Sequence, residues 1–483
     1  MKTQLVIDNQ AVDAQNGKTF ERCSATTGET VSVGAAASTV DAITAADSAK
    51  AAFDKWSKVG PTERRRILLR AADILENKRI GLRSTMAMEI GASELWVDFN
   101  VMASAALFRE AAGLATQIQG ETIPTDKLGA LSFTERQPVG VVLSIVPWNG
   151  PVILAARAIA YPLVCGNTVV FRASETSPAT HLAVAESLYE AGLPAGALNF
   201  LTCSAESAPE VTDALIRHPD IRRINFTGST RVGRIIAEKA ATHLKRCLLE
   251  LGGKAPFVVL DDADIDSAVN AATFGAFLYQ GQICMSTERF VVDEKIADEF
   301  VARFAARTKE LPVGDPSVLS ECVVGPLIST ESGSRINGLL DDALAKGATI
   351  ATGGHADGAL MKPTIVDHVH HSMQIYDEET FGPVTTIVRV SGLEEAIRVA
   401  NDTAYGLSAA VFGRDVTRAL QVARDIDAGC VHINGATVQN EAQAPYGGMK
   451  ESGYGRFDGR AVIDEFTELK WITIEPAAQP YPF

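Results

Sequence analysis

Residues 221–233 read IRRINFTGSTRVG. Residues 221–226 are predicted to form a strand, and the turn at Thr227-Gly228-Ser229 leads into a helix from about 229 to 241. The turn is not a P-loop, because Arg234 and Ile235 stand where Lys and Ser or Thr are required. Taken alone, it favours an ordinary strand–turn–helix connection over a phosphate site at the helix N-terminus.

The same alternation of strands and helices continues on both sides of this stretch. Strands are predicted at 139–146, 167–171, 197–202 and 247–251, with helices between them. A second alternating series runs from the strand at 257–260 to the strand at 430–434. Strands separated by helices predict right-handed βαβ units and parallel sheets, so the fold class is α/β with two doubly wound domains.

One segment interrupts the alternation and predicts a third, smaller element. Residues 119–138 resemble a β hairpin or arm, and residues 468–474 near the C-terminus have a strand pattern that needs a partner. That partner is either the arm or another subunit. We therefore expect one domain from 1–118 and 139–250, a second from 251–450, and a small β bridging element from 119–138 and 460–483.

Composition and charge exclude several classes of protein. The chain has 483 residues, 46% of them hydrophobic, and a formal net charge of -15. An acidic surface repels phosphate backbones and anionic lipids, so we expect no nucleic-acid or membrane partner. Seven cysteines without a pattern fit reduced thiols in the cytoplasm better than a disulfide scaffold.

Three polar residues occur at points where chemistry is plausible. Cys284 is a lone cysteine in a Gly-containing stretch, which suits either a nucleophile or a small buried side chain. Glu250 ends a predicted strand and could act as a general base, or could instead pair with Lys254. Asn149 also follows a strand, where its amide could stabilise an oxyanion or cap the next helix.

Other candidates depend on loops. Glu175 follows a strand and could accept ribose hydroxyls of a nucleotide, or be a solvated loop residue. Glu379 could bind a sugar hydroxyl or a metal, or have no role. The histidines at 368, 370 and 371 invite a metal site, but no helical His motif or Cys partner accompanies them. We expect no metal and predict an exposed edge there.

Six motifs occur together in one order along the chain. They are Pro147-Trp148-Asn149, Phe226-Thr227-Gly228-Ser229 with Gly233, Glu250-Leu251-Gly252-Gly253-Lys254, Gly281-Gln282-Ile283-Cys284, Glu379-Thr380-Phe381-Gly382-Pro383, and residues 445–453 with the sequence PYGGMKESG. This combination closely resembles the NAD(P)-dependent aldehyde dehydrogenase family over essentially the whole chain. The resemblance implies a Rossmann-like coenzyme domain for the first domain and a catalytic domain for the second.

The resemblance also implies residue roles. Cys284 matches the nucleophile, Glu250 the base that activates the deacylating water, and Asn149 an oxyanion donor. The matching coenzyme-binding positions are Trp148, Arg172, Glu175, Gly228, Ser229, Gly233, Glu379 and Phe381. The negative charge of Glu175 favours NAD and makes NADP the less suitable coenzyme.

Three departures from the family pattern bear on ligands. Arg172 replaces the usual Lys near the adenosine ribose, so a forked donor replaces a point charge. Gly150 and Arg157 replace aromatic residues and open the substrate tunnel. Arg157 either offers hydrogen bonds to a substrate hydroxyl or pairs with a carboxylate in the helix layer. Together with Trp96 and Tyr446, these residues resemble the members that act on aromatic aldehydes.

The expected function is NAD-dependent oxidation of an aromatic aldehyde, of the salicylaldehyde or benzaldehyde type, to its carboxylate. The alternatives are vanillin-type or broad-range aldehydes, a cofactor-independent thiol esterase, and a non-catalytic protein on this fold. An esterase would require a histidine base, and no histidine occurs in any of the motifs at strand ends. The family resemblance further implies a homodimer or a dimer of dimers.

Overall fold

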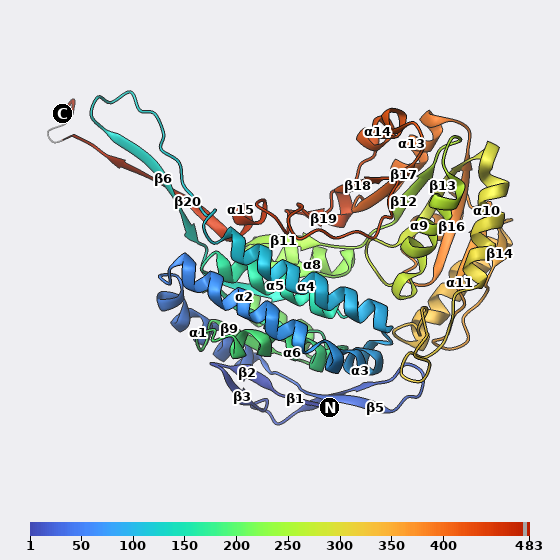
Figure 1. The fold of residues 1–483 in the computed structure, drawn as a ribbon. Helices are drawn as coiled ribbons and strands as arrows, with labels where there is room; N and C mark the ends of the chain where they lie inside the picture. The colour runs from blue at the N-terminus through green and yellow to red at the C-terminus, as the bar shows by residue number, and fades with distance from the viewer. Residues whose placement is uncertain (477–480) are drawn as a thin grey trace.

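The computed structural model describes residues 1–476 and 481–483, and it contains two large sheets, each covered by helices (Figure 1). The first sheet has eight strands. In spatial order they are β19 (Gly453–Tyr454), β11 (Arg246–Glu250), β10 (Ile221–Thr227), β7 (Val141–Ile145), β8 (Thr168–Arg172), β9 (Leu198–Leu201), β2 (Leu5–Ile7) and β3 (Gln10–Val12). The five strands from β11 to β9 are parallel, as expected, while antiparallel strands flank them at both edges.

Alternating side chains of the first sheet build two cores. Val142 and Val169 belong to one core, whereas Val141 and Val170 belong to the other. The first core includes α2 (Pro61–Asn77), α3 (Arg79–Ile90), α4 (Glu94–Leu114), α5 (Pro151–Val164) and α6 (Pro178–Glu190). The second includes α1 (Thr39–Trp56), α7 (Ala208–Arg217) and α8 (Thr230–Thr242). Apolar residues on both faces of each strand therefore produce a sheet covered on both sides.

The second sheet follows the same logic. Its order is β14 (Thr349–Thr352), β15 (Thr364–Asp367), β16 (Val384–Val390), β13 (Thr287–Asp293), β12 (Ala255–Val259), β17 (Ser408–Phe412) and β18 (Cys430–Ile433), with only β14 antiparallel. One face packs on α9 (Ile265–Phe277) and α10 (Glu294–Lys309). The other face packs on α11 (Thr330–Ala345), α13 (Leu393–Asn401) and α14 (Val416–Asp425).

A two-stranded ribbon extends away from the body of the molecule (Figure 1). Strand β6 (Leu131–Pro138) pairs antiparallel with β20 (Thr467–Ile474) along its whole length. The late strand thus has the 119–138 arm as its partner, which was one of the two alternatives. The part of the tail at 477–480 lies outside the described residues. The exposed apolar side chains of this ribbon include Trp471, which is 70% exposed.

The remaining elements are short. A small sheet near the N-terminus has the order β1 (Lys2–Thr3), β5 (Thr30–Ala35) and β4 (Thr19–Cys23). The short helices are α12 (Gln374–Asp377), α15 (Val462–Phe466) and the 3-10 turns at Leu278–Gly281 and Lys450–Ser452. Within the part of the chain that the structure describes, no helix is both long enough and apolar enough to cross a membrane.

A glycine separates two consecutive helices of the first core. Helix α3 ends at Ile90 and α4 begins at Glu94. Gly91 separates them with a φ of +63°, and an added Cβ there would lie 2.6 Å from Pro326. The left-handed conformation and the close approach both require glycine, so the helix ends there.

Candidate active site

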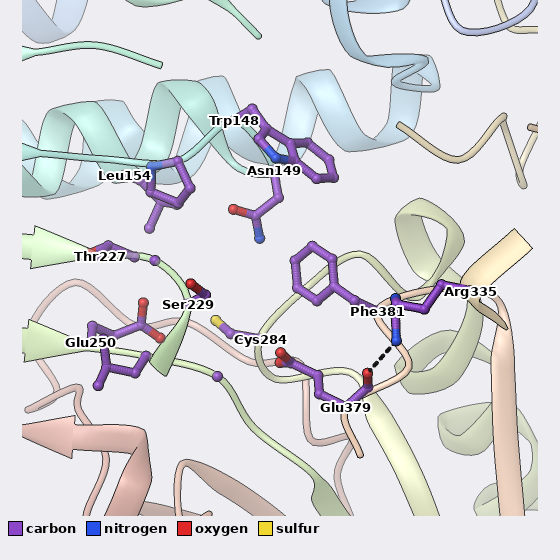
Figure 2. Close-up of a pocket in the computed structure, with 14 residues that line it drawn as sticks. Trp148, Asn149, Leu154, Thr227, Ser229, Glu250, Cys284, Arg335, Glu379 and Phe381 are labelled. Carbon is purple, nitrogen blue, oxygen red and sulfur yellow. Dashed lines mark hydrogen bonds between the residues drawn. The ribbon is translucent and has the colours of Figure 1, made fainter. Parts of the chain in front are cut away.

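Three neighbouring strands of the first sheet end at one cavity of about 320 Å³ (Figure 2). Asn149 follows β7, Ser229 follows β10, and Glu250 is the last residue of β11. From the second sheet, Cys284 precedes β13 and Glu379 precedes β16, and both also line the cavity. The strand-end argument thus predicted that Asn149, Ser229 and Glu250 lie together, whereas Cys284 and Glu379 reach the cavity from loops that precede strands.

The loop that presents Cys284 is conformationally strained. Tyr279, Gln280 and Gly281 have φ values of 48°, 54° and 68°. Two carbonyl groups hold the Gln280 amide, those of Gly91 at 3.2 Å and Pro326 at 2.9 Å. Non-glycine residues rarely adopt such φ values unless the surroundings fix them, which is common at functional sites.

Cys284 borders the cavity and contacts a tyrosine. Its Sγ lies 3.3 Å from the hydroxyl oxygen of Tyr446. Burial raises the pKa of the Cys284 thiol well above its usual value, and the neighbouring Glu250 carboxylate raises it further. The Tyr446 hydrogen bond lowers it again. In the free protein the thiol form is therefore favoured, and a nearby base is needed to generate a thiolate.

Glu250 is 1% exposed and has no direct cation partner in an ion pair among the described residues. Burial raises the pKa of its carboxyl group, while the contacts with Cys284, Arg157 and Tyr446 lower it. The alternative of a pair with Lys254 was wrong, because the Lys254 Nζ binds Glu288 Oε2 at 2.7 Å. A buried carboxyl group with a raised pKa beside a thiol has the properties of a general base.

Asn149 does not cap the helix that follows it. Gly150 is the N-cap residue of α5, without a side-chain cap. The Asn149 side-chain nitrogen donates to the Gln282 carbonyl at 3.0 Å, next to the nucleophile loop. A side-chain amide nitrogen has two N–H donors. One can bond to the Gln282 carbonyl while the other remains able to donate to a ligand in the cavity.

Trp96 forms a hydrogen bond with the backbone of Asn149. Its indole N–H donates to the Asn149 carbonyl at 2.9 Å, and its ring stacks on Tyr279 with centroids 4.9 Å apart. Trp96 is not among the residues that line the cavity. The structure therefore links Trp96 to both the amide and the nucleophile loop, and its substrate contact stays a prediction.

The turn after β10 has the features of a phosphate site. The Ser229 side chain caps α8 and accepts the Val232 N–H at 3.4 Å. A Cβ at Gly228 would lie 2.5 Å from the Phe226 ring, and one at Gly233 would lie 2.5 Å from Leu251. Glycine is thus required at both positions, and the helix N-terminus beside the cavity suits a dinucleotide phosphate.

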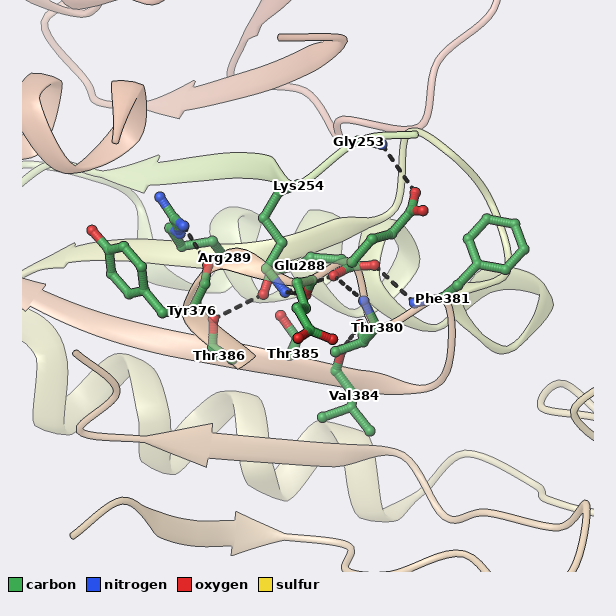
Figure 3. A network of polar contacts seen from close by, with 12 residues as sticks. Gly253, Lys254, Glu288, Arg289, Tyr376, Thr380, Phe381, Val384, Thr385 and Thr386 are labelled. Carbon is green, nitrogen blue, oxygen red and sulfur yellow. Dashed lines mark hydrogen bonds and ion pairs between the residues drawn. The ribbon is translucent and has the colours of Figure 1, made fainter. Parts of the chain in front are cut away.

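The loop of Glu379 is held by a buried ion pair (Figure 3). The Glu288 carboxylate accepts a hydrogen bond from the Lys254 ammonium group. It also accepts hydrogen bonds from the backbone N–H groups of Thr380, at 2.7 Å, and Phe381, at 3.0 Å. These contacts fix Phe381 at a φ of +47°. The Glu379 carboxylate accepts the Gly253 N–H at 2.9 Å. Burial and the Glu288 charge raise the pKa of Glu379 to about 8.

Sequence reasoning missed Arg335. This residue of α11 lines the cavity and donates to the carbonyl groups of Glu379, at 3.1 Å, and Thr380 (Figure 2). It occurs in no motif, and only the packing of α11 against the Glu379 loop brings it to the site. Leu154 also lines the cavity without having been predicted, whereas the motifs included Pro147, Thr227, Leu251 and Gly252 without assigning them a role.

Arg172 and Glu175 lie at the end of β8, outside the lining of the cavity. Their side chains form an ion pair at 3.5 Å, and Arg172 Nε lies 3.3 Å from Cys203 Sγ. The two predicted ribose-binding side chains are therefore neighbours beside β7, as the strand order requires. Their coenzyme contacts stay a prediction.

Arg157 pairs with a carboxylate, but not one in the helix layer. Its guanidinium binds Asp458 at 2.8 Å and Asn440 at 2.6 Å. It also lies over the Tyr446 ring, 4.2 Å from the ring centroid. Asp458 is far along the chain from Arg157, so sequence spacing gave no sign of this pair. Arg157 therefore supports Tyr446, and its contact with substrate stays a prediction.

Gly150 is buried beside the cavity. A Cβ at this position would lie 3.1 Å from Ile153 and 3.6 Å from Leu154, which lines the cavity. A larger side chain at Gly150 would thus displace Leu154 or enter the cavity, so glycine here maintains space.

The histidines at 368, 370 and 371 are exposed, as expected. His368 lies 3.7 Å from Asp367, and His370 contacts the Lys346 carbonyl. Among the described residues, no group of three or more His, Cys, Asp or Glu side chains is arranged to hold a metal ion. All seven cysteines are free thiols.

Comparison with known proteins gives a consistent result. The Aldehyde dehydrogenase family matches residues 11–472. Salicylaldehyde dehydrogenase of Pseudomonas sp. (strain C18) is 64% identical over 483 residues, which is 100% of both chains. The crystal structure of a salicylaldehyde dehydrogenase from Pseudomonas putida G7 complexed with salicylaldehyde has a TM-score of 0.99, at 65% identity and 100% coverage of both chains.

A more distant structure is that of PnpE in complex with nicotinamide adenine dinucleotide. It has a TM-score of 0.95 at 37% identity, and the match covers 100% of this chain and 99% of that one. The sequence match, the fold and the arrangement of Cys284, Glu250 and Asn149 at one cavity agree. This protein is a member of the aldehyde dehydrogenase family, an aldehyde-oxidising oxidoreductase.

Proposed function

We propose that this protein oxidises an aromatic aldehyde to its carboxylate with NAD as the coenzyme. The observation that carries the proposal is the position of Cys284 and Glu250, which reach one cavity from two different sheets. The cavity also adjoins the glycine turn at 228 and the Glu379 loop. A thiol, a general base and a dinucleotide turn at one cavity are the parts that this oxidation requires.

Cys284 is the nucleophile in the proposed mechanism. Its thiolate attacks the carbonyl carbon, and Asn149 donates to the oxygen on which negative charge develops. The coenzyme, when bound, supplies the hydride acceptor. After the oxidation the acyl group remains on Cys284 as a thioester. Glu250 then takes a proton from the water that hydrolyses this thioester, and the carboxylate product leaves.

The coenzyme assignment rests on residues of the first domain. Ser229 and the N–H groups of α8 suit the pyrophosphate, and Glu379 and Phe381 suit the nicotinamide ribose and ring. Trp148 lies edge-on to Phe381, with ring centroids 5.8 Å apart. Glu175, beside Arg172, places a negative charge where a 2′-phosphate would lie, which favours NAD over NADP.

The substrate class rests on the relatives and on Gly150. The relative at 64% identity is a salicylaldehyde dehydrogenase, and Gly150 leaves space beside Leu154 for a ring. Vanillin-type or broad-range aldehydes are the alternative substrates. In Gly150→Phe the ring would fill that space, so we expect kcat/KM to fall more for aromatic than for short aliphatic aldehydes. Equal losses of kcat/KM for aromatic and aliphatic aldehydes would contradict the inference that the space at Gly150 accommodates an aromatic ring.

The direct test follows NADH absorbance with a panel of aldehydes. We expect the aromatic aldehydes to give the highest kcat/KM and Cys284→Ala to abolish NADH formation, since no other thiol lines the cavity in the described part of the chain. Substantial turnover by Cys284→Ala would exclude the nucleophile assignment. Ester hydrolysis without NAD that exceeded dehydrogenation would favour a thiol esterase, and inactivity towards every aldehyde would favour a non-catalytic protein.

The wider organisation belongs to the same proposal. The coenzyme domain comprises 1–118 and 139–250, the catalytic domain 251–450, and the bridging element 119–138 and 460–483. The exposed apolar residues of the β6–β20 ribbon, among them Leu469 and Trp471, support a role in a homodimer or a dimer of dimers. Seven free cysteines support a cytoplasmic location.

A further inference from the structure

The Tyr446 hydroxyl group lies between the nucleophile and the base. It is 3.3 Å from Cys284 Sγ and donates to Glu250 Oε1 at 3.1 Å. A tyrosine hydroxyl has one proton to donate and lone pairs to accept another. Because an ionised carboxylate can only accept, the Tyr446 proton goes to Glu250 and the oxygen is free to accept the thiol proton.

The surroundings fix Tyr446 in this position. Its backbone N–H and carbonyl group both bond to Phe457, at 2.8 and 2.7 Å. Its ring lies beneath the Arg157 guanidinium, which Asp458 and Asn440 hold in turn. Tyr446 is 5% exposed, so water has little access to compete for its hydroxyl group. A residue that only filled the cavity wall would not need its oxygen between two reacting groups.

We propose that Tyr446 is a catalytic residue that relays the proton of Cys284 to Glu250. The Cys284 S–H bond breaks as its proton bonds to the Tyr446 oxygen. The original Tyr446 O–H bond breaks as that proton bonds to the Glu250 carboxylate. Tyr446 is unchanged at the end, and the net result is a Cys284 thiolate and a protonated Glu250. This inference rests on the proposed roles of Cys284 and Glu250.

The electrostatics of the site support a relay. Burial and the Glu250 charge raise the pKa of the Cys284 thiol, so a thiolate does not form without assistance. Burial also raises the pKa of Tyr446, which disfavours a free tyrosinate, while the Arg157 cation lowers it. A concerted transfer through the hydroxyl avoids an isolated charge on the tyrosine.

The test removes one oxygen atom with Tyr446→Phe in the full-length enzyme. The first readout is the rate at which iodoacetamide alkylates Cys284 between pH 6 and 10, followed on the Cys284 peptide by mass spectrometry. We expect alkylation at pH 7 to slow by about 10²-fold, the low end of typical general acid–base effects, and the pH profile to move to higher pH. Tyr189→Phe is the control, because it removes a partly buried hydroxyl that is bonded to the Leu198 carbonyl and does not line the cavity.

A double variant separates a relay from two independent effects. If Tyr446 passes the proton to Glu250, the Glu250→Gln and Tyr446→Phe variants interrupt the same path. The double variant should then be alkylated no more slowly than the slower single variant. Multiplied losses in the double variant would overturn the proposal, as would wild-type alkylation of Tyr446→Phe.

The second readout is the pre-steady-state burst of NADH with saturating aromatic aldehyde. The relay predicts a slower burst in Tyr446→Phe at saturating substrate. A raised KM with an unchanged burst would instead make Tyr446 a substrate contact only and would overturn the proposal. If the wild type forms no NADH with any aldehyde, the proposed function fails, and the alkylation comparison alone still decides the role of Tyr446.

Discussion

Glu250 and Glu288 are both buried glutamates near the cavity, yet their surroundings differ. Glu288 accepts hydrogen bonds from a lysine ammonium and two backbone N–H groups. In the described part of the chain, Glu250 has no cation partner and has polar contacts only with the Tyr446 hydroxyl and the Cys284 thiol, and burial raises the pKa of its carboxyl group. A fully paired carboxylate fixes a loop, whereas a poorly paired one remains able to take a proton.

The contrast indicates how the protein divides two tasks. The Glu288 network holds Thr380 and Phe381 in a backbone conformation that Phe381 alone would avoid. The Glu250 site places a buried base beside a thiol, with no cation partner among the described residues. Stability is therefore expected to depend on Glu288 and its lysine, and turnover on Glu250.

The largest expected effect is the loss of turnover in Glu250→Gln. Glutamine keeps the shape and can accept the Tyr446 hydrogen bond, but it cannot take a proton. We expect the steady-state rate to fall by about 10³-fold, within the usual range for a general base, while a slow burst of NADH approaches one equivalent per site. Steady-state turnover near the wild-type rate would exclude Glu250 as the base.

The stability of the Glu250→Gln variant tests the same difference between the two glutamates. Since Gln removes a buried, poorly paired charge, Glu250→Gln should leave the free energy of unfolding unchanged or raise it. Glu288→Gln is the matched control, and it should lower stability without a specific block in thioester hydrolysis. Equal kinetic profiles for the two variants would contradict the division of tasks.

The next effect in size concerns the cation that pairs with Glu288. Lys254→Met removes the ammonium and leaves a buried carboxylate with only backbone donors. We expect the free energy of unfolding to fall by about 3 kcal/mol, as for other broken buried pairs. Denaturant unfolding measures it. Lys295→Met is the control, because it breaks the exposed pair with Asp261 and should cost under about 1 kcal/mol. Similar losses in both would show that the buried network adds no special stability.

Part of this division could be predicted from the sequence. The strand pattern and the rule that sites lie at the carboxyl ends of strands placed Asn149, Ser229 and Glu250 together. Local reasoning also offered Lys254 as a partner for Glu250, four residues away. The structure pairs Lys254 with Glu288 instead, because β12 and β13 are neighbours in the second sheet.

The rest required tertiary structure. Arg157 and Asp458 are separated by 301 residues, and no spacing rule connects them. Tyr446 appeared in the sequence only as a candidate substrate contact, although its hydroxyl group lies between Cys284 and Glu250. Arg335 had no signal at all, because a helix of the second domain carries it to the Glu379 loop. Long-range polar contacts of this kind leave no local periodicity.

A third carboxylate, Glu379, has fewer hydrogen-bond donors than Glu288, but among the residues that the structure describes it has a backbone donor that the Glu250 carboxylate lacks. Its titration gives the smallest effect that we expect, a change in NAD affinity with pH. Glu379 accepts one backbone hydrogen bond, and its pKa is raised to about 8, so it is largely protonated at pH 7 in the free enzyme. The ionised form accepts ribose hydroxyl groups better, so NAD binding should strengthen as the pH rises through 8. We expect the Kd to fall by about tenfold between pH 7 and 9.

Calorimetry in buffers of different ionisation enthalpy measures both the Kd and the proton that NAD binding should release from Glu379. Glu379→Gln should bind NAD with a Kd that does not depend on pH in this range. Glu250→Gln should retain a pH dependence that is moved to lower pH, because the Glu250 charge is one of those that raise the pKa of Glu379. A pH-independent Kd in the wild type would mean that Glu379 is already ionised, and would group it with Glu288 rather than with Glu250.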